Sequence, residues 1–152
     1  MKLAEALILR SDYQKRVEHL KNRLFKNVRV QEGDQPDEDP AVMKAELTGL
    51  LEQLKLLIQN INKTNIHTKF DGNQTLADAL VIRDVVGQER KIYSDLIEPA
   101  TMRHDRYSRS EIKYVTTISV KETQKYIDEL SKRYREMDVK IQELNWKTDL
   151  LE

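Results

Sequence analysis

Residues 119–152 carry an apolar repeat that steps alternately by three and four residues without a break. Its members are Val120, Thr123, Ile127, Leu130, Tyr134, Met137, Ile141, Leu144, Thr148 and Leu151. This spacing puts one apolar stripe along a single helix, as in a coiled coil or helical bundle. At 1.5 Å per residue the helix would be roughly 50 Å long. The rest of the chain must therefore supply further helices that cover the stripe.

Three other segments show the same spacing and predict three more helices. Residues 2–25 step through Leu3, Ala6, Arg10, Tyr13, Val17, Leu20 and Leu24. Residues 40–61, with Asp39 as the expected N-cap, step through Met43, Leu47, Leu50, Leu54, Leu57 and Ile61. Residues 75–97, which precede Pro99, step through Leu76, Ala79, Arg83, Val86, Arg90, Tyr93 and Ile97.

Two short segments between these helices alternate in the manner of β-strands. Val28 and Val30 are separated by Arg29, and residues 111–118 contain a dense run of β-branched and aromatic side chains. We therefore expect a short two-stranded antiparallel β ribbon that pairs about residues 26–31 with 111–118. With short connections, the four helices would form an up-down-up-down bundle or antiparallel coiled coil, a single domain of residues 1–152.

Composition excludes several classes of function. Lysine plus arginine equals aspartate plus glutamate at 26 each, so no global field attracts nucleic acid or an anionic membrane. The chain has no cysteine, hence no disulfide, thiol nucleophile or zinc–thiolate site, which fits a cytoplasmic protein. No apolar run approaches the length of a transmembrane helix. Glu5 also interrupts the apolar N-terminus, unlike a signal peptide.

A basic segment with interleaved aromatic residues is the first candidate site. It contains Arg103, Arg106, Tyr107, Arg109 and Lys113, which can bind phosphates while a ring stacks on a base. The acidic loop of residues 32–39 should lie at the same end of the bundle. Because the chain also lacks the broad positive surface of nucleic-acid binders, we favour pairing between these two segments over nucleic-acid binding.

A polar cluster at the other end of the bundle is the second candidate. Its residues are Asn62, Thr64, Asn65, Asn145 and Trp146. Converging amides and an indole can bind a small polar ligand. We favour the alternative that they tie a long turn to the last helix, with the tryptophan ring covering apolar neighbours.

Arginines also occupy three positions of the apolar stripes, namely Arg10, Arg83 and Arg90. Such arginines can hold an anion, but their long stems more often let the charged head reach water. No glutamate stands three residues before any histidine, as di-iron bundles require. No nucleophile elbow or glycine-rich phosphate loop is present. We therefore expect no metal, no cofactor and no catalytic residue.

Four motifs together resemble those of a small family of uncharacterised bacterial proteins, some of which are labelled septicolysin. They are Arg106-Tyr107-Ser108-Arg109-Ser110-Glu111-Ile112-Lys113, Ile141-Gln142-Glu143-Leu144-Asn145-Trp146, Asn62-Lys63-Thr64-Asn65 and Thr75-Leu76-Ala77-Asp78-Ala79-Leu80. The resemblance covers nearly the whole chain and implies no established activity, cofactor or catalytic residue. The label implies a membrane-active protein.

The function expected from the sequence is a non-enzymatic, self-associating scaffold or protein-interaction module. A homo-oligomer is expected because a two-stranded ribbon has unpaired edges. Leu144, Thr148 and Leu151 would also extend beyond the first helix and face water in a monomer. The alternatives are an RNA- or nucleotide-binding protein that uses residues 103–113, and a membrane-active protein of the septicolysin type.

Overall fold

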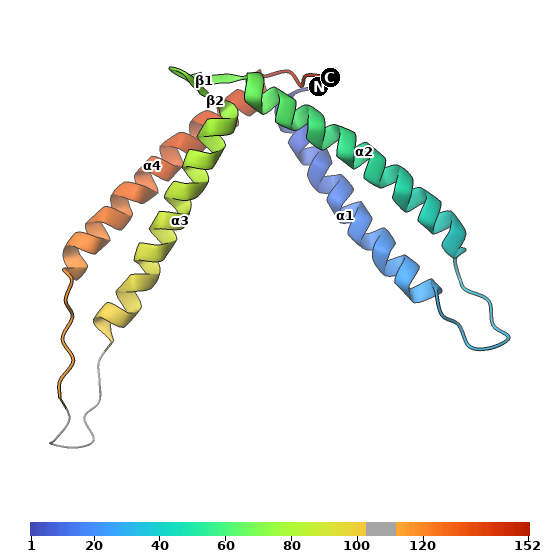
Figure 1. The fold of residues 1–152 in the computed structure, drawn as a ribbon, viewed down its shortest axis with the longest axis horizontal. Helices are drawn as coiled ribbons and strands as arrows, with labels where there is room; N and C mark the ends of the chain where they lie inside the picture. The colour runs from blue at the N-terminus through green and yellow to red at the C-terminus, as the bar shows by residue number, and fades with distance from the viewer. Residues whose placement is uncertain (103–111) are drawn as a thin grey trace. The chain divides into compact units, whose positions relative to one another are not determined.

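The computed structural model describes residues 1–102 and 112–152, and Figure 1 shows the arrangement of its helices and strands. The described residues form helices α1 (Leu3–Asn27), α2 (Pro40–His67), α3 (Leu76–Thr101) and α4 (Val120–Lys147), and strands β1 (Lys69–Asp71) and β2 (Gln74–Thr75). The predicted class, a mainly α protein with four helices and a small two-stranded antiparallel sheet, is confirmed.

The chain forms two compact units. The first contains Met1–Ala77 and Gln142–Glu152, and the second contains Asp78–Ile141. The expectation that residues 1–152 form a single domain stays a prediction.

In the first unit, α1 and α2 lie side by side and antiparallel (Figure 1). Their facing stripes supply a core that contains Leu3, Ala4, Ala6, Leu20, Met43, Leu50, Leu57 and Ile61. These are largely the residues of the predicted repeats, because a three-and-four spacing keeps one face of each helix toward its neighbour. Helix α2 begins as predicted: the Asp39 carboxylate accepts a hydrogen bond from the Ala41 N–H, and Pro40 opens the helix.

The two chain ends meet in the first unit (Figure 1). The Leu3 N–H donates to the Thr148 carbonyl, and the Leu150 N–H donates to the Met1 carbonyl, each at 2.9 Å. The Lys2 ammonium lies 2.8 Å from the Asp149 carboxylate. Helix α4 ends at Lys147, and Asp149 forms an isolated antiparallel β-bridge with Lys2.

The predicted overhang of the last helix is wrong. Residues 148–151 bond to the start of α1 and to α2 instead of continuing the helix. Leu144 and Thr148 are half-buried as a result, and Leu151 keeps 39% of its surface exposed. Contacts within one chain therefore cover much of the surface that we expected a second copy to cover.

The β-sheet is a hairpin between α2 and α3. Lys69 pairs with Thr75 and Asp71 pairs with Gln74, which leaves a two-residue loop. Gly72 has a φ of +52°, a conformation that favours glycine. The predicted ribbon of residues 26–31 with 111–118 is wrong, since residues 26–27 end α1 and no described residue of 28–31 or 112–118 is in a strand.

The second unit consists of α3 and α4 packed antiparallel. Its buried side chains include Ala79, Val86, Ile127, Leu130 and Ile141. The start of α4 is capped, because the Ser119 hydroxyl accepts a hydrogen bond of 3.2 Å from the Glu122 N–H. The remaining contacts between these helices involve tyrosines and arginines and are described below.

Candidate functional site

The structure describes one of the five residues of the predicted basic site. Arg103, Arg106, Tyr107 and Arg109 lie outside the described residues, and Lys113 is exposed. In the acidic loop, the Glu38 carboxylate binds the Arg23 guanidinium of α1, with 3.0 Å between Nε and Oε2. This hydrogen bond lowers the pKa of Glu38. Pairing between the acidic loop and residues 103–113 stays a prediction.

The predicted polar cluster divides into buried and exposed residues. Thr64 and Asn145 are buried, whereas Asn62 and Trp146 are exposed and Asn65 is half-buried. The Thr64 hydroxyl donates to the Asn60 carbonyl at 2.7 Å and accepts a hydrogen bond of 2.9 Å from the Leu151 N–H. Thr64 thus anchors the C-terminal segment to α2. Both interpretations of this cluster, a ligand site and a tie between the turn and the last helix, stay predictions.

The arginines of the apolar stripes have three different surroundings. The Arg83 guanidinium lies 2.8 Å from the Asp138 carboxylate of α4 and 3.0 Å from that of Asp84. Burial lowers the pKa of Arg83, but these two hydrogen bonds outweigh it and raise the pKa. Arg90 lies over the Tyr134 ring, with its Cζ 5.4 Å from the ring centroid. The buried Nε of Arg10 has no hydrogen-bond partner among the residues that the structure describes.

Tyrosines fill the contact between α3 and α4. The Tyr126 hydroxyl donates to the Glu89 carboxylate at 2.6 Å, and this hydrogen bond raises the pKa of Tyr126. The Tyr93 and Tyr126 rings meet edge to face, with centroids 5.1 Å apart. Gly87 faces Tyr134 so closely that an added Cβ would lie 2.9 Å from the ring. These contacts fix the two helices against each other.

Helix α3 has a second apolar face that the sequence analysis missed. We call this face the outer seam and define it as Val81, Val85, Gln88, Ile92 and Leu96. Val81, Val85 and Ile92 are 63%, 56% and 59% exposed. Their spacing of four and seven residues is itself a sequence signal. We missed it because the stripe that faces α4 has the same period along the same helix.

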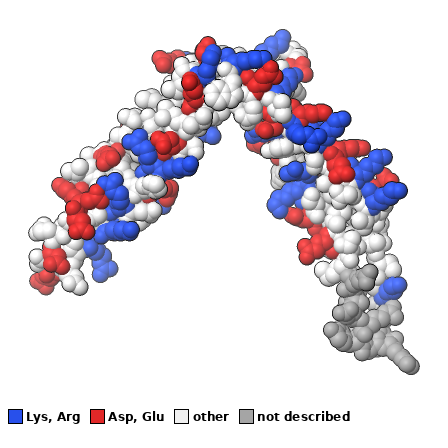
Figure 2. Space-filling model, turned by 180° about the vertical axis from the view of Figure 1, so that it is seen from behind, with Lys and Arg blue, Asp and Glu red and all other residues white. Residues whose placement is uncertain are grey.

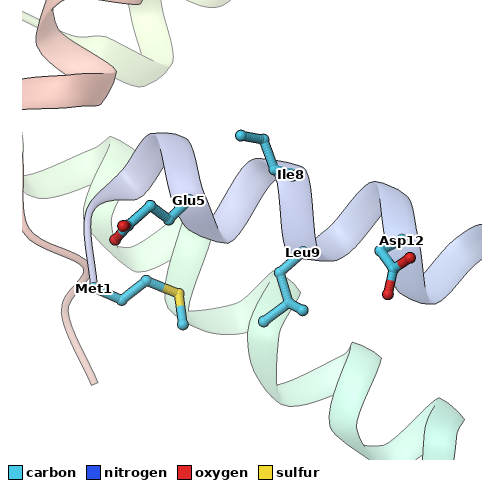
Figure 3. Close-up of a pocket in the computed structure, with 5 residues that line it drawn as sticks. All are labelled: Met1, Glu5, Ile8, Leu9 and Asp12. Atoms are coloured by element: carbon cyan, nitrogen blue, oxygen red, sulfur yellow. The ribbon is translucent and has the colours of Figure 1, made fainter.

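A shallow pocket lies along the first half of α1 (Figure 3). It has a volume of about 590 Å³ and is lined by Met1, Glu5, Ile8, Leu9 and Asp12. Two carboxylates beside three apolar side chains fit a basic, apolar ligand better than an anion. The Glu5 carboxylate already accepts a hydrogen bond of 2.6 Å from the Lys2 N–H at the start of α1.

Charges alternate along the helices rather than gathering by sign. Figure 2 shows lysine and arginine side chains interspersed with aspartate and glutamate on the visible face. Within residues 1–102 and 112–152, no three histidine, aspartate or glutamate side chains are grouped so as to hold a metal ion. In the same residues no helix is both long and apolar enough to cross a membrane.

Comparison with known proteins gives a family and a fold. The model of a family of unknown function, DUF6847, matches residues 10–150. The chain belongs to this family. A crystal structure of a functionally unknown conserved protein from Corynebacterium diphtheriae is 48% identical to this DUF6847 chain. The match covers 99% of each chain with a TM-score of 0.91. Comparison with curated proteins gives no match.

Membership of DUF6847 confirms the resemblance to a family of uncharacterised proteins that the motifs indicated. The septicolysin label appears in neither the family description nor the description of the crystal structure. The fold of this DUF6847 chain is therefore shared with a solved relative, and a functional assignment must come from its own surfaces.

Proposed function

We propose that this protein is a non-enzymatic helical interaction module of the cytoplasm that self-associates through the outer seam of α3. The observation that carries the proposal is the exposure of regularly spaced apolar side chains on one face of a helix whose other face already packs on α4. Apolar residues at heptad spacing are a pattern that pairs helices, and an exposed apolar face of this kind marks an interaction surface.

The strength of the association follows from the exposed surface. Fully burying one Val, Leu or Ile side chain contributes about 1.5–3 kcal/mol, and three seam residues are each more than half exposed. Two seams in contact then contribute on the order of 6–10 kcal/mol, against an association cost of about 4–15 kcal/mol. At the favourable end of these ranges about 6 kcal/mol remains, so we expect a weak dimer with a dissociation constant on the order of tens of micromolar.

The test compares two seam variants with a matched control. Val85→Glu and Ile92→Glu place a charge in the centre of the outer seam, and each should raise the dissociation constant at least about tenfold. Val139→Glu is the control, because Val139 is an exposed apolar residue of α4 with 62% exposure, similar to the seam residues. Light scattering at tens of micromolar should give a larger mass for the unaltered protein and the control than for the seam variants.

A folding defect would confuse this comparison, so circular dichroism should first show equal helix content in all four proteins. The proposal fails if the unaltered protein has a monomeric mass at these concentrations. It also fails if the seam variants associate as strongly as the control.

A further inference from the structure

The outer seam has the symmetry that two identical helices need to pair about a two-fold axis. Val81 and Leu96 lie equally far from one midpoint of the helix, and Val85 and Ile92 lie equally far from the same midpoint. Two antiparallel copies therefore place Val81 against Leu96 of the partner subunit. They also place Val85 against Ile92 of the partner subunit. A two-fold interface requires such self-complementarity, because each contact occurs twice.

We propose that α3 helices from two protomers pair antiparallel about a two-fold axis that passes between Gln88 and Glu89. This inference rests on the proposed function, because it gives the self-association through the outer seam an orientation and a register. The occupant of the seam is thus a second copy of the same chain.

Charged residues beside the seam favour the antiparallel orientation. Asp84 and Lys91 lie seven residues apart on one flank of the seam and on opposite sides of the midpoint. In the antiparallel pair, Asp84 is two residues, or about 3 Å along the axis, from Lys91 of the partner subunit. Both side chains are largely exposed, at 66% and 75%. Within α3 Asp84 also pairs with Arg83, and Lys91 pairs with Asp95, so the contact across the interface is shared with these pairs.

A parallel pair would bring like charges together. The two flanks of the outer seam are the rows of residues on either side of it, with Asp84 on one flank and Glu89 on the other. In a parallel coiled coil, a residue at the position of Asp84 faces the residue five positions later on the opposite flank of the partner helix. Asp84 would then face Glu89 of the partner subunit, twice per dimer. The Glu89 carboxylate is held by the Tyr126 hydroxyl of α4 within its own chain, so it cannot move freely away from such a partner. The antiparallel pair brings like charges together only once, because its axis beside Glu89 sets this residue about 1.5 Å along the axis from Glu89 of the partner subunit.

Cysteine cross-linking distinguishes the two orientations, and the chain has no native cysteine to interfere. Val85→Cys and Ile92→Cys are made as separate proteins, one with a size tag. In the antiparallel pair, residue 85 lies opposite residue 92 of the partner subunit. Two copies of residue 85 are about 10.5 Å apart along the axis, beyond the roughly 7 Å that a disulfide spans between Cα atoms.

Under mild oxidation, the mixture of the two proteins should form the mixed disulfide dimer, and each protein alone should form none. Disulfide dimers of each protein alone indicate the parallel pair and overturn the inference. A dimer seen by light scattering without any of these disulfides overturns it as well, while leaving the proposed function standing. A monomeric protein at tens of micromolar overturns both.

A charge exchange gives an independent measurement. Asp84→Lys should weaken the dimer about fivefold, because it sets two lysines against each other at both ends of the interface. Adding Lys91→Asp to the same chain should restore the original dissociation constant. If the double variant binds as weakly as the single variant, Asp84 and Lys91 do not face each other in the dimer.

Discussion

The same glycine-to-alanine substitution should have opposite effects in two helices of this protein. Alanine is favoured over glycine inside a helix by about 0.8–1.0 kcal/mol. Gly49 lies inside α2, and a Cβ added there meets no atom within 4 Å. Gly49→Ala should therefore raise the free energy of unfolding by about 1 kcal/mol.

At Gly87 the helix propensity that alanine adds is opposed by overpacking against a neighbouring ring. The added Cβ would lie 2.9 Å from Cε2 and 3.2 Å from Cδ2 of Tyr134. The ring is half-buried and has the Arg90 guanidinium over it, so making room displaces both. Overpacking of this kind costs about 1–3 kcal/mol. The net effect of Gly87→Ala should be a loss of about 1 kcal/mol, and the two variants should differ by about 2 kcal/mol.

Urea unfolding followed by circular dichroism measures both variants against the unaltered protein. Removing the ring isolates the cause: in a Tyr134→Ala background, Gly87→Ala should stabilise by about 1 kcal/mol, as Gly49→Ala does in the unaltered chain. The reasoning is refuted if Gly87→Ala stabilises the unaltered protein as much as Gly49→Ala does.

Two further predictions concern the junction of the chain ends. Thr64→Val keeps the shape of a buried side chain but removes the hydroxyl that binds the Leu151 N–H, so it should lower the free energy of unfolding by about 1–2 kcal/mol in urea titrations. Lys2 lowers the pKa of Asp149 below its ordinary value of 3.8, so their pairing stabilises the junction above that pH and is lost as the pH falls through the lowered pKa. The protection factor of the Leu150 amide, which is its exchange rate relative to the intrinsic rate at the same pH, should therefore fall in strong acid. Lys2→Gln should remove this fall. A constant protection factor in the unaltered protein, or the same fall in Lys2→Gln, would contradict the assignment.

The helices were predictable from sequence because their apolar repeats are long and unbroken. A repeat of three and four over many residues is compatible with a helix and with little else. The start of α2 was equally clear, since Asp39 and Pro40 suit the first positions of a helix for local reasons. These features depend on neighbours in sequence, which is why no knowledge of the tertiary fold was needed.

The prediction of a ribbon that pairs residues 26–31 with 111–118 was wrong, because the strand preference of a segment depends on its having a partner strand. Ile112 and Val115 are strong strand formers, yet they are 89% and 73% exposed. The true hairpin was missed for the converse reason. Its strands are short and mostly polar, and the Gly72-Asn73 loop was the sole local signal for it.

The five residues of the polar cluster were predicted as one set, but their surroundings differ. Thr64 and Asn145 are buried, and Thr64 ties α2 to the C-terminal segment. The partner of Thr64 could not be foreseen, because it is the backbone of Leu151 in a segment expected to be helical. The spacing of the outer seam can be seen in the sequence, but its exposure depends on which face of α3 packs on α4. Arg83 and Arg90 interrupt the stripe that does pack on α4, so the sequence did not show which of the two faces is buried.

The exposed outer seam of α3 should make this protein self-associate. Sedimentation velocity of the unaltered protein over a dilution series from hundreds of micromolar to below one micromolar tests it most directly. We predict a continuous shift from dimer to monomer with a midpoint on the order of tens of micromolar. A sedimentation coefficient that stays at the monomer value throughout the series would contradict the account.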